Sequence, residues 1–391
     1  MSLTVIVCCA TTIYLFYYAI TSLKKPRLIC RHGPFRDFLT SRCPFINDKL
    51  LPTPWCFTSN GQSIVAILLQ EFRPQIAYDR QILFLSDGGE AALDWFVGGT
   101  DSHSPTVLFT HGITGDSQSY YLKVIVPMVQ SIGCRCAVFN QRGCGGVPLK
   151  TARIQSCINT DDLGIALDAI KRRYPSGPIL AVGYSMGGIV ICQYLSQQAD
   201  NSLIDAAITV STPTDIHAAS ESLNSFGFNR VVNYYIARKL VNFAERNRSV
   251  LEPKVNFEQV IQAKTIRQFD SCCTAVVLGF NNVDEYYEAA SIRRKLGTVR
   301  RPLLFLMSTD DIFVLDTTPI REIESSVYLG AVLLPRGGHI GFVDGFLWPW
   351  PPFYAERFVY EYVKTLVKFS MQRSLKMLPQ EFEGQKDAEK T

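Results

Sequence analysis

The chain has 391 residues, of which 47% are hydrophobic, and a formal net charge of +4. This length suits one large α/β domain with an insertion. The small charge, with no basic run interleaved with aromatic residues, argues against a nucleic-acid partner. The 12 cysteines include no C-x-x-C pair and no zinc-type Cys/His spacing. We therefore expect no metal and no other cofactor, while disulfides remain open.

The first predicted element is a transmembrane helix at residues 3–23, which carry no charged side chain. A helix needs roughly 20 apolar residues to span a bilayer. Tyr14, Tyr17 and Tyr18 suit the interfacial half of such a span. A cleaved signal peptide is the rival interpretation. It is disfavoured because no basic residue precedes the apolar run and no clear small-x-small cleavage site follows it.

Basic residues follow the apolar segment directly, at Lys24, Lys25, Arg27, Arg31 and Arg36. The positive-inside rule would place the C-terminal side in the cytosol, but the rule is statistical and leaves the side of the catalytic domain open. We expect a single-pass membrane protein of the endoplasmic reticulum or another endomembrane, with the bilayer as a partner.

Residues 24–80 show no firm periodicity and are expected to form an extension that packs on the catalytic domain. Strands are predicted at residues 81–85, 91–97, 106–110, 135–140, 179–182, 206–211, 303–307 and 327–334. Helices are predicted at residues 118–131 and 160–173, and residues 178–198 are predicted to hold a strand–turn–helix element. This alternation indicates a mainly parallel eight-stranded sheet with helices on both faces, within a catalytic domain at residues 81–372. The polar tail, residues 373–391, is expected to fray.

The interval between the sixth and seventh predicted strands is much longer than one strand–helix step. Within it, residues 230–246 and 257–269 have the pattern of amphipathic helices. We therefore expect a helical cap at about residues 213–300, inserted after the sixth strand.

A G-x-S-x-G pattern lies between an apolar strand and an apolar helix, at residues 183–187. Such a strand–turn–helix is typical of a nucleophile elbow, in which the tight turn presents one serine, here Ser185. A serine hydroxyl needs a positioned base, and the base needs an acid that fixes its tautomer.

Among the five histidines, His339 follows the last predicted strand in a glycine-rich loop, where the chain order Ser, acid, His requires the base. The acid should follow the preceding strand, at Asp310 or Asp311. We favour Asp311 because it precedes the apolar Ile312, and we expect Asp310 to be a hydrogen-bonding or capping neighbour.

Backbone N–H groups should stabilise the negative charge of the tetrahedral intermediate. We expect these donors to be Met186, directly after the nucleophile, and Ile113, in the loop after the third strand. His111 and Asp116 match an H-x4-D spacing of some acyltransferases, but we interpret His111 as a residue that shapes the loop.

An aromatic, proline-rich segment follows His339, at residues 342–354, and holds Trp348 and Trp350. It either packs under the cap as core, or its aromatic side chains line the acyl pocket or rest on the bilayer. On the second interpretation Phe342, Trp348 and Trp350 bind substrate.

Five sequence motifs stand in a specific order behind the apolar segment: HGITGDS, NQRGCGG, GYSMGG, the Asp310–Asp311 pair and RGGHIGF. In this combination the chain resembles the membrane-anchored abhydrolase-domain proteins one to three, which have bacterial, plant and yeast relatives, over about residues 50–370. The resemblance implies the α/β-hydrolase fold and a triad of Ser185, Asp311 and His339. One departure is the segment Ile312-Phe313-Val314-Leu315, where relatives often have proline.

Members of that family are esterases, acylglycerol lipases or phospholipases, and yeast relatives also make medium-chain ethyl esters. The chain is therefore expected to be a membrane-anchored serine hydrolase that cleaves carboxylic esters of lipids through an acyl-enzyme on Ser185. One alternative is an acyltransferase that uses the same acyl-enzyme. Another is a catalytically silent binding protein on the same fold.

Overall fold

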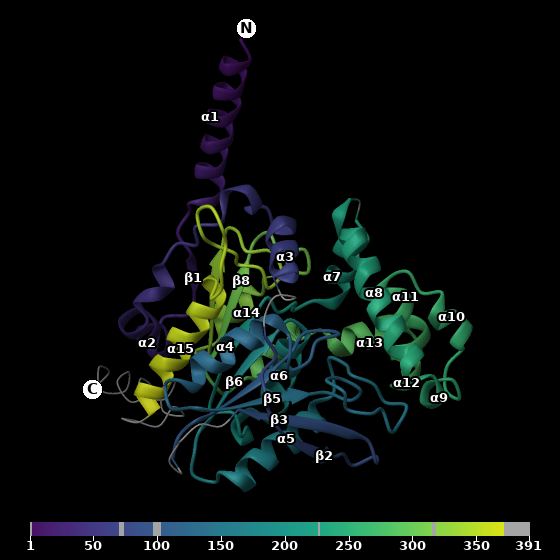
Figure 1. Cartoon of the computed structure of the whole chain (residues 1–391). Coiled ribbons are helices and arrows are strands. Elements are labelled where there is room, and N and C mark those ends of the chain that lie inside the picture. The colour runs from purple at the N-terminus through teal and green to yellow at the C-terminus, as the bar shows by residue number, and fades with distance from the viewer. Residues whose placement is uncertain (1, 70–73, 97–102, 226, 315–317, 371–391) are drawn as a thin grey trace.

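A computed structural model describes residues 2–69, 74–96, 103–225, 227–314 and 318–370 of the chain (Figure 1). The predicted frayed tail, residues 373–391, lies outside the described residues, as do Val97 and Leu315.

A nine-stranded sheet forms the centre of the molecule, in the order β1-β9-β8-β7-β6-β4-β5-β3-β2. The strands are β1 (Arg27–Ile29), β2 (Asp79–Phe84), β3 (Glu90–Phe96), β4 (Thr106–Thr110), β5 (Arg135–Asn140), β6 (Ile179–Tyr184), β7 (Ala206–Val210), β8 (Leu303–Ser308) and β9 (Leu329–Leu334). Pairing is parallel from β5 through β4, β6, β7 and β8 to β9, and antiparallel for β1, β2 and β3. The predicted α/β fold with a mainly parallel sheet is confirmed.

The sheet has one strand more than the eight we predicted. The additional strand, β1, lies at the edge of the sheet and pairs with β9, so that Arg27 lies opposite Leu333 and Ile29 opposite Ala331. Only one of its three residues is buried, so it has no apolar alternation that the sequence could reveal.

Helices cover both faces of the sheet because successive strand residues point to opposite sides. Val107 and Phe109 of β4 belong to one core cluster, and Leu108 to the other. The first cluster includes α2 (Pro34–Arg42), α4 (Tyr120–Gln130) and α15 (Tyr354–Ser370). The second includes α5 (Thr160–Arg173), α6 (Met186–Gln198) and α14 (Ile320–Ser325). Short 3₁₀ turns are η1 (Pro44–Asn47), η2 (Pro54–Cys56) and η3 (Ala199–Asn201).

Helices fill the predicted cap interval between β7 and β8 and form a lobe beside the sheet (Figure 1). They are α7 (Ile216–Asn224), α8 (Phe228–Arg246), α9 (Arg248–Leu251), α10 (Phe257–Ile261), α11 (Ile266–Phe269), the π-helical turn η4 (Asp270–Thr274), α12 (Ala275–Val277), α13 (Val283–Ala290) and η5 (Arg293–Thr298). The prediction of one helix over residues 257–269 is wrong. The segment breaks because Thr265 caps α11, accepting from Gln268 N, while Asn233 of α8 accepts from Ile266 N.

The N-terminal part of the chain contributes α1 (Leu3–Ser22), which projects from one end of the molecule, and α3 (Ser59–Leu68) (Figure 1). Among the described residues, α1 is the one helix long and apolar enough to cross a membrane. Phe35 and Leu39 of α2 are buried against Gly330 of β9, so residues after α1 pack on the sheet.

Candidate active site

Ser185 lies at the junction of β6 and α6, with φ 51° and ψ −120°. This strained conformation is typical of a nucleophile elbow. The adjoining glycines allow the tight packing of α6 on the sheet. A Cβ at Gly187 would lie 2.5 Å from the carbonyl oxygen of Thr110, and one at Gly188 would lie 2.0 Å from Thr212 Oγ1. Ser185 is buried under the cap, on the wall of a pocket.

The structure brings together the three residues that the sequence places far apart. Ser185 Oγ lies 2.8 Å from His339 Nε2, and His339 Nδ1 lies 3.0 Å from each carboxylate oxygen of Asp311. A carboxylate only accepts, so the imidazole carries its proton on Nδ1 and Nε2 accepts from the serine hydroxyl. Asp311 is fully buried, and its Oδ1 also accepts from Phe313 N at 2.8 Å.

Side chains from several elements hold the loop around His339. Ser63 Oγ of α3 accepts from His339 N at 3.1 Å, and Ser211 Oγ accepts from Ile340 N at 3.0 Å. The Phe313 ring lies against the imidazole, with ring centroids 4.1 Å apart and the ring planes tilted by 35°. The base is therefore fixed in position by contacts that its own sequence neighbourhood does not reveal.

Asp310 lies beside the triad and contacts the same loop without reaching the imidazole ring. Its Oδ1 accepts from Gly338 N at 3.0 Å, and Arg336 lies 3.6 Å from its other oxygen. Burial raises its pKa. This is the arrangement we expected for the neighbouring aspartate.

The loop after β4 approaches the nucleophile at Gly112, where a Cβ would lie 3.3 Å from Ser185 Cβ. Gly112 N donates to Tyr121 Oη at 2.9 Å, and His111 Nδ1 donates to Gly112 O at 2.9 Å. The Asp116 carboxylate instead accepts from Gln118 N at 2.8 Å, so His111 and Asp116 do not form a dyad. Ile113 lines the pocket.

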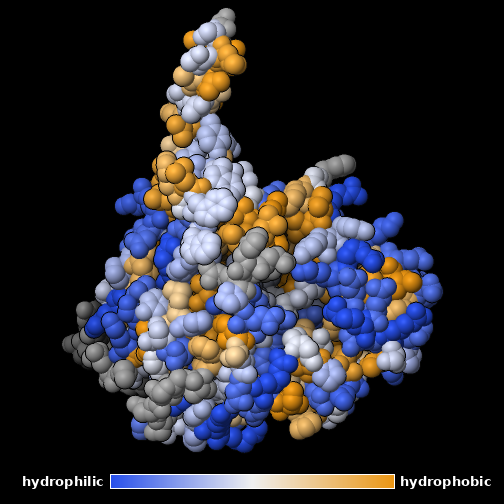
Figure 2. Space-filling model, viewed as in Figure 1, coloured by the Kyte–Doolittle hydropathy of each residue, from blue (hydrophilic) through white to orange (hydrophobic). Residues whose placement is uncertain are grey.

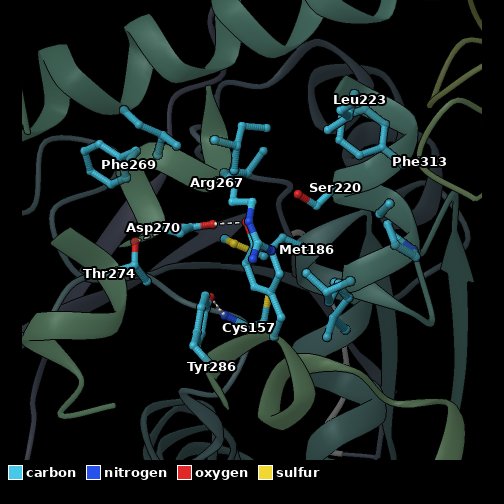
Figure 3. A pocket seen from close by; sticks show the side chains of 18 of the residues that line it. Cys157, Met186, Ser220, Leu223, Arg267, Phe269, Asp270, Thr274, Tyr286 and Phe313 are labelled. Carbon is cyan, nitrogen blue, oxygen red and sulfur yellow. Dashed lines mark hydrogen bonds between the residues drawn. The ribbon is translucent and has the colours of Figure 1, made fainter. Parts of the chain in front are cut away.

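The pocket over Ser185 lies between the sheet and the cap (Figure 3). Most of its wall is apolar: Ile113, Ile154, Met186, Ile189, Pro213, Ile216, Ala219, Leu223, Leu240, Phe243, Ile266, Phe269 and Phe313. Phe342, Trp348 and Trp350 do not line it. Phe342 is fully buried in the core, where its ring fills the space beside Gly337, so the expectation that it binds substrate in the pocket is not met. Trp348 and Trp350 are exposed on the surface, so they are neither core under the cap nor pocket wall.

Sequence reasoning missed the polar part of the pocket, which the cap supplies. Asp270 is buried and accepts from Thr274 Oγ1 at 2.6 Å and from the Tyr287 hydroxyl at 3.0 Å. Figure 3 shows Asp270 and Thr274 next to each other on one side of the pocket, and Arg267 also lines the pocket. Burial raises the pKa of Asp270 to about 6. The π-helical turn that carries it gives no period that a sequence pattern could detect.

A buried carboxyl group also lies in the core behind the elbow. Glu356 of α15 is nearly fully buried, and the nearby hydroxyls of Tyr120 and Tyr184 are buried with it. Burial raises the pKa of Glu356 to about 7 from about 4.5 in the unfolded chain. The folded state therefore favours the protonated acid.

We expect this group to make the fold less stable as the pH rises. The contribution of Glu356 to the free energy of unfolding is greatest below about pH 4.5 and is lost as the pH rises to about 7. The free energy of unfolding falls by up to about 3 kcal/mol over this range. In thermal unfolding scans, the melting temperature of Glu356→Gln minus that of the wild type should therefore increase from pH 5 to pH 8. A difference in melting temperature that stays constant over this range would show that Glu356 does not titrate in the fold.

The described residues contain no group of three or more His, Cys, Asp or Glu side chains that could hold a metal ion. All twelve cysteines are free thiols. The hydrogen-bonded Ser185, His339 and Asp311 have the arrangement of an acyl-transfer site, with a nucleophile, a base and an orienting acid.

The geometry agrees with comparisons to known proteins. A match to the alpha/beta hydrolase fold family covers residues 105–316, and the chain belongs to that family. Phospholipase ABHD3 of Mus musculus is 34% identical over 362 residues, which cover 91% of this chain and 88% of the mouse protein. Protein abhd-3.2 of Caenorhabditis elegans is 32% identical over 307 residues, which cover 78% of this chain and 82% of the nematode protein. Monoacylglycerol lipase of Saccharomyces cerevisiae is 29% identical over 62% of this chain and 56% of the yeast protein. The resemblance inferred from the motifs is confirmed.

Proposed function

We propose that the chain is a membrane-anchored serine hydrolase that cleaves carboxylic esters of lipids through an acyl-enzyme on Ser185. The observation that carries this proposal is the continuous hydrogen-bonded chain Asp311–His339–Ser185 at the wall of an apolar pocket. The similarity to a phospholipase and a monoacylglycerol lipase supports lipid esters as the substrate class.

In the first half of the reaction Ser185 Oγ attacks the ester carbonyl carbon while His339 Nε2 takes the hydroxyl proton. Asp311 stabilises the imidazolium that forms. The N–H groups of Met186 and Ile113 donate to the oxyanion of the tetrahedral intermediate. Met186 is the first residue of α6, so its N–H has no acceptor within the helix.

Collapse of that intermediate breaks the ester C–O bond, and His339 gives its proton to the leaving alcohol. A water molecule then attacks the acyl-enzyme, with His339 again as the base, and releases the carboxylic acid and Ser185. The apolar side chains of the pocket suit the acyl chain, because each CH₂ removed from water contributes about 0.8 kcal/mol.

We propose further that α1 anchors the chain in the endoplasmic reticulum or another endomembrane. Its contacts support retention of the helix in the mature protein. The Tyr18 hydroxyl donates to Pro52 O at 2.6 Å, and the Tyr14, Tyr17 and Tyr18 rings all meet Phe57 edge-on. A cleaved signal peptide would leave Phe57 without these partners.

The experiment that tests the activity uses the full-length protein in lipid vesicles, with a panel of short soluble esters, monoacylglycerols and phospholipids. We expect release of carboxylic acid from at least one lipid ester, and loss of that release when a fluorophosphonate probe saturates the protein. Hydrolysis that continues in the fully labelled protein, or a protein that neither labels nor hydrolyses any ester, would contradict the proposal.

A further inference from the structure

Large apolar side chains are exposed together at the base of α1. We call this surface the anchor platform, and it comprises six residues that are each more than half exposed: Leu51, Trp55, Phe346, Leu347, Trp348 and Trp350. Figure 2 shows hydrophobic residues gathered where α1 leaves the body of the protein. Exposed apolar patches of this kind mark a surface that meets a protein or a membrane.

The two segments of the anchor platform are joined to each other. Pro52 and Asp344 form an antiparallel bridge, and Trp55 Nε1 donates to Leu347 O at 2.9 Å. The platform is therefore one surface built from residues nearly 300 positions apart in the sequence.

Hydrogen bonds also tie this surface to the second half of α1. The Tyr14 hydroxyl donates to Pro54 O, and the Tyr18 hydroxyl donates to Pro52 O at 2.6 Å. Phe57 lies among the tyrosine rings, with centroid distances of 5.5 to 5.8 Å. The platform thus lies at the level of Tyr14 to Tyr18 along the helix.

The length of α1 then sets the depth of the platform. The 20 residues of the helix rise about 30 Å, which equals the thickness of the hydrocarbon core. The part before Tyr14, Leu3–Ile13, rises only about 17 Å, too little to cross the bilayer. A helix that spans the membrane must therefore bring Tyr14 to Tyr18, and the platform beside them, to the bilayer.

We propose that the anchor platform is immersed in the lipid bilayer as a second membrane contact beside α1. This inference rests on the proposed membrane anchor. The chemistry of the surface favours lipid over a second copy of the chain, because it is continuous with the apolar helix and holds three of the four tryptophans of the protein, a residue enriched at the membrane interface.

Helix α3 connects this surface to the triad. Ser63 Oγ of this helix accepts from His339 N at 3.1 Å, and Gln62 Oε1 accepts from Val343 N at 3.0 Å. Ile67 and Leu68 of the same helix are exposed. The loop that carries the catalytic base is therefore held by the helix that follows the Trp55 segment of the platform.

The direct test is quenching of tryptophan fluorescence by lipids brominated on their acyl chains, with the full-length protein in vesicles. The wild type should lose much of its fluorescence. The variant Trp55→Phe/Trp348→Phe/Trp350→Phe keeps only Trp95, which is buried in β3, and should be quenched little. Equal quenching of the two proteins would overturn the proposal. The proposal would also be overturned if the tryptophans of the wild type were shielded from acrylamide but not quenched by bromolipid, because a second copy of the chain would then cover the platform.

A functional arm uses Trp348→Ala/Trp350→Ala in the full-length protein. Hydrolysis of a long-chain lipid in vesicles should fall several-fold, while hydrolysis of a short soluble ester stays unchanged. The matched control, Phe84→Ala, removes an exposed aromatic ring from the edge strand β2 and should change neither rate. Equal loss on both substrates with a lowered melting temperature would contradict the proposal. If no ester is hydrolysed at all, the proposed function fails, and quenching still decides the position of the platform.

Discussion

Ser185→Ala should lower ester hydrolysis by on the order of 10⁵ to 10⁶-fold and abolish labelling by a fluorophosphonate probe. The attacking Oγ, 2.8 Å from His339 Nε2, is the atom removed. The fold should remain intact because serine and alanine both carry a Cβ, so the strain at φ 51° is unchanged. Hydrolysis, probe labelling and melting temperature are measured on the same preparations.

Ser196→Ala provides the matched control for this variant. Ser196 lies on the same helix, α6, and its hydroxyl only donates to Gln193 O at 2.8 Å. Its loss should leave labelling and turnover as in the wild type. Near wild-type hydrolysis by a folded Ser185→Ala protein would refute the assignment of the nucleophile.

Asp311→Asn should lower turnover by about 10³ to 10⁴-fold. An asparagine can donate to the imidazole through its amide, which favours the tautomer with the proton on Nε2. In that tautomer the ring nitrogen facing Ser185 Oγ can no longer accept the hydroxyl proton. The measurement is the single-turnover acylation rate with a chromogenic ester, alongside the melting temperature.

The neighbouring Asp310→Asn should lose far less, because its main contact is retained. An asparagine oxygen can still accept from Gly338 N, as Asp310 Oδ1 does at 3.0 Å. Comparison of the two variants separates the role of the triad acid from that of a residue that only hydrogen-bonds the loop. A larger loss in Asp310→Asn than in Asp311→Asn would reverse the two roles.

The centre of the fold was predictable because its signals are local. Each of the strands β4 to β9 is a short, mainly apolar run that is fully buried, and the elbow has glycines that the packing of α6 demands. The order Ser185, Asp311, His339 then follows from chain position alone. The short edge strand β1 carried no such pattern, since it is defined by its partner β9.

The aromatic segment after His339 shows where sequence patterns are insufficient. A run of Trp, Phe and Pro has the same composition in a core and on a membrane-facing surface. Phe342 is fully buried and Trp348 is exposed, although they lie six positions apart. The difference arises from the distant partners Gln62, Pro52 and Trp55, which sequence spacing does not place beside this loop.

The cap posed a similar difficulty. Its existence follows from the length of the interval between β7 and β8, and α8 has a regular apolar period. The polar group in the pocket could not be predicted in this way. Asp270 is recognisable as a buried pocket residue only from its hydrogen bonds with Thr274 and Tyr287 in the folded cap. Such hydrogen bonds depend on how the helices of the cap pack, which sequence spacing does not reveal.

The acyl-enzyme is the most direct test of the central claim. The full-length protein is mixed with a lipid ester, quenched in acid within the first turnovers and digested, and the peptide that contains Ser185 is weighed by mass spectrometry. The expected result is an added mass equal to the acyl group on Ser185, removed by hydroxylamine and absent from Ser185→Ala. Steady turnover with no adduct on Ser185, or with the adduct on another residue, would contradict the mechanism.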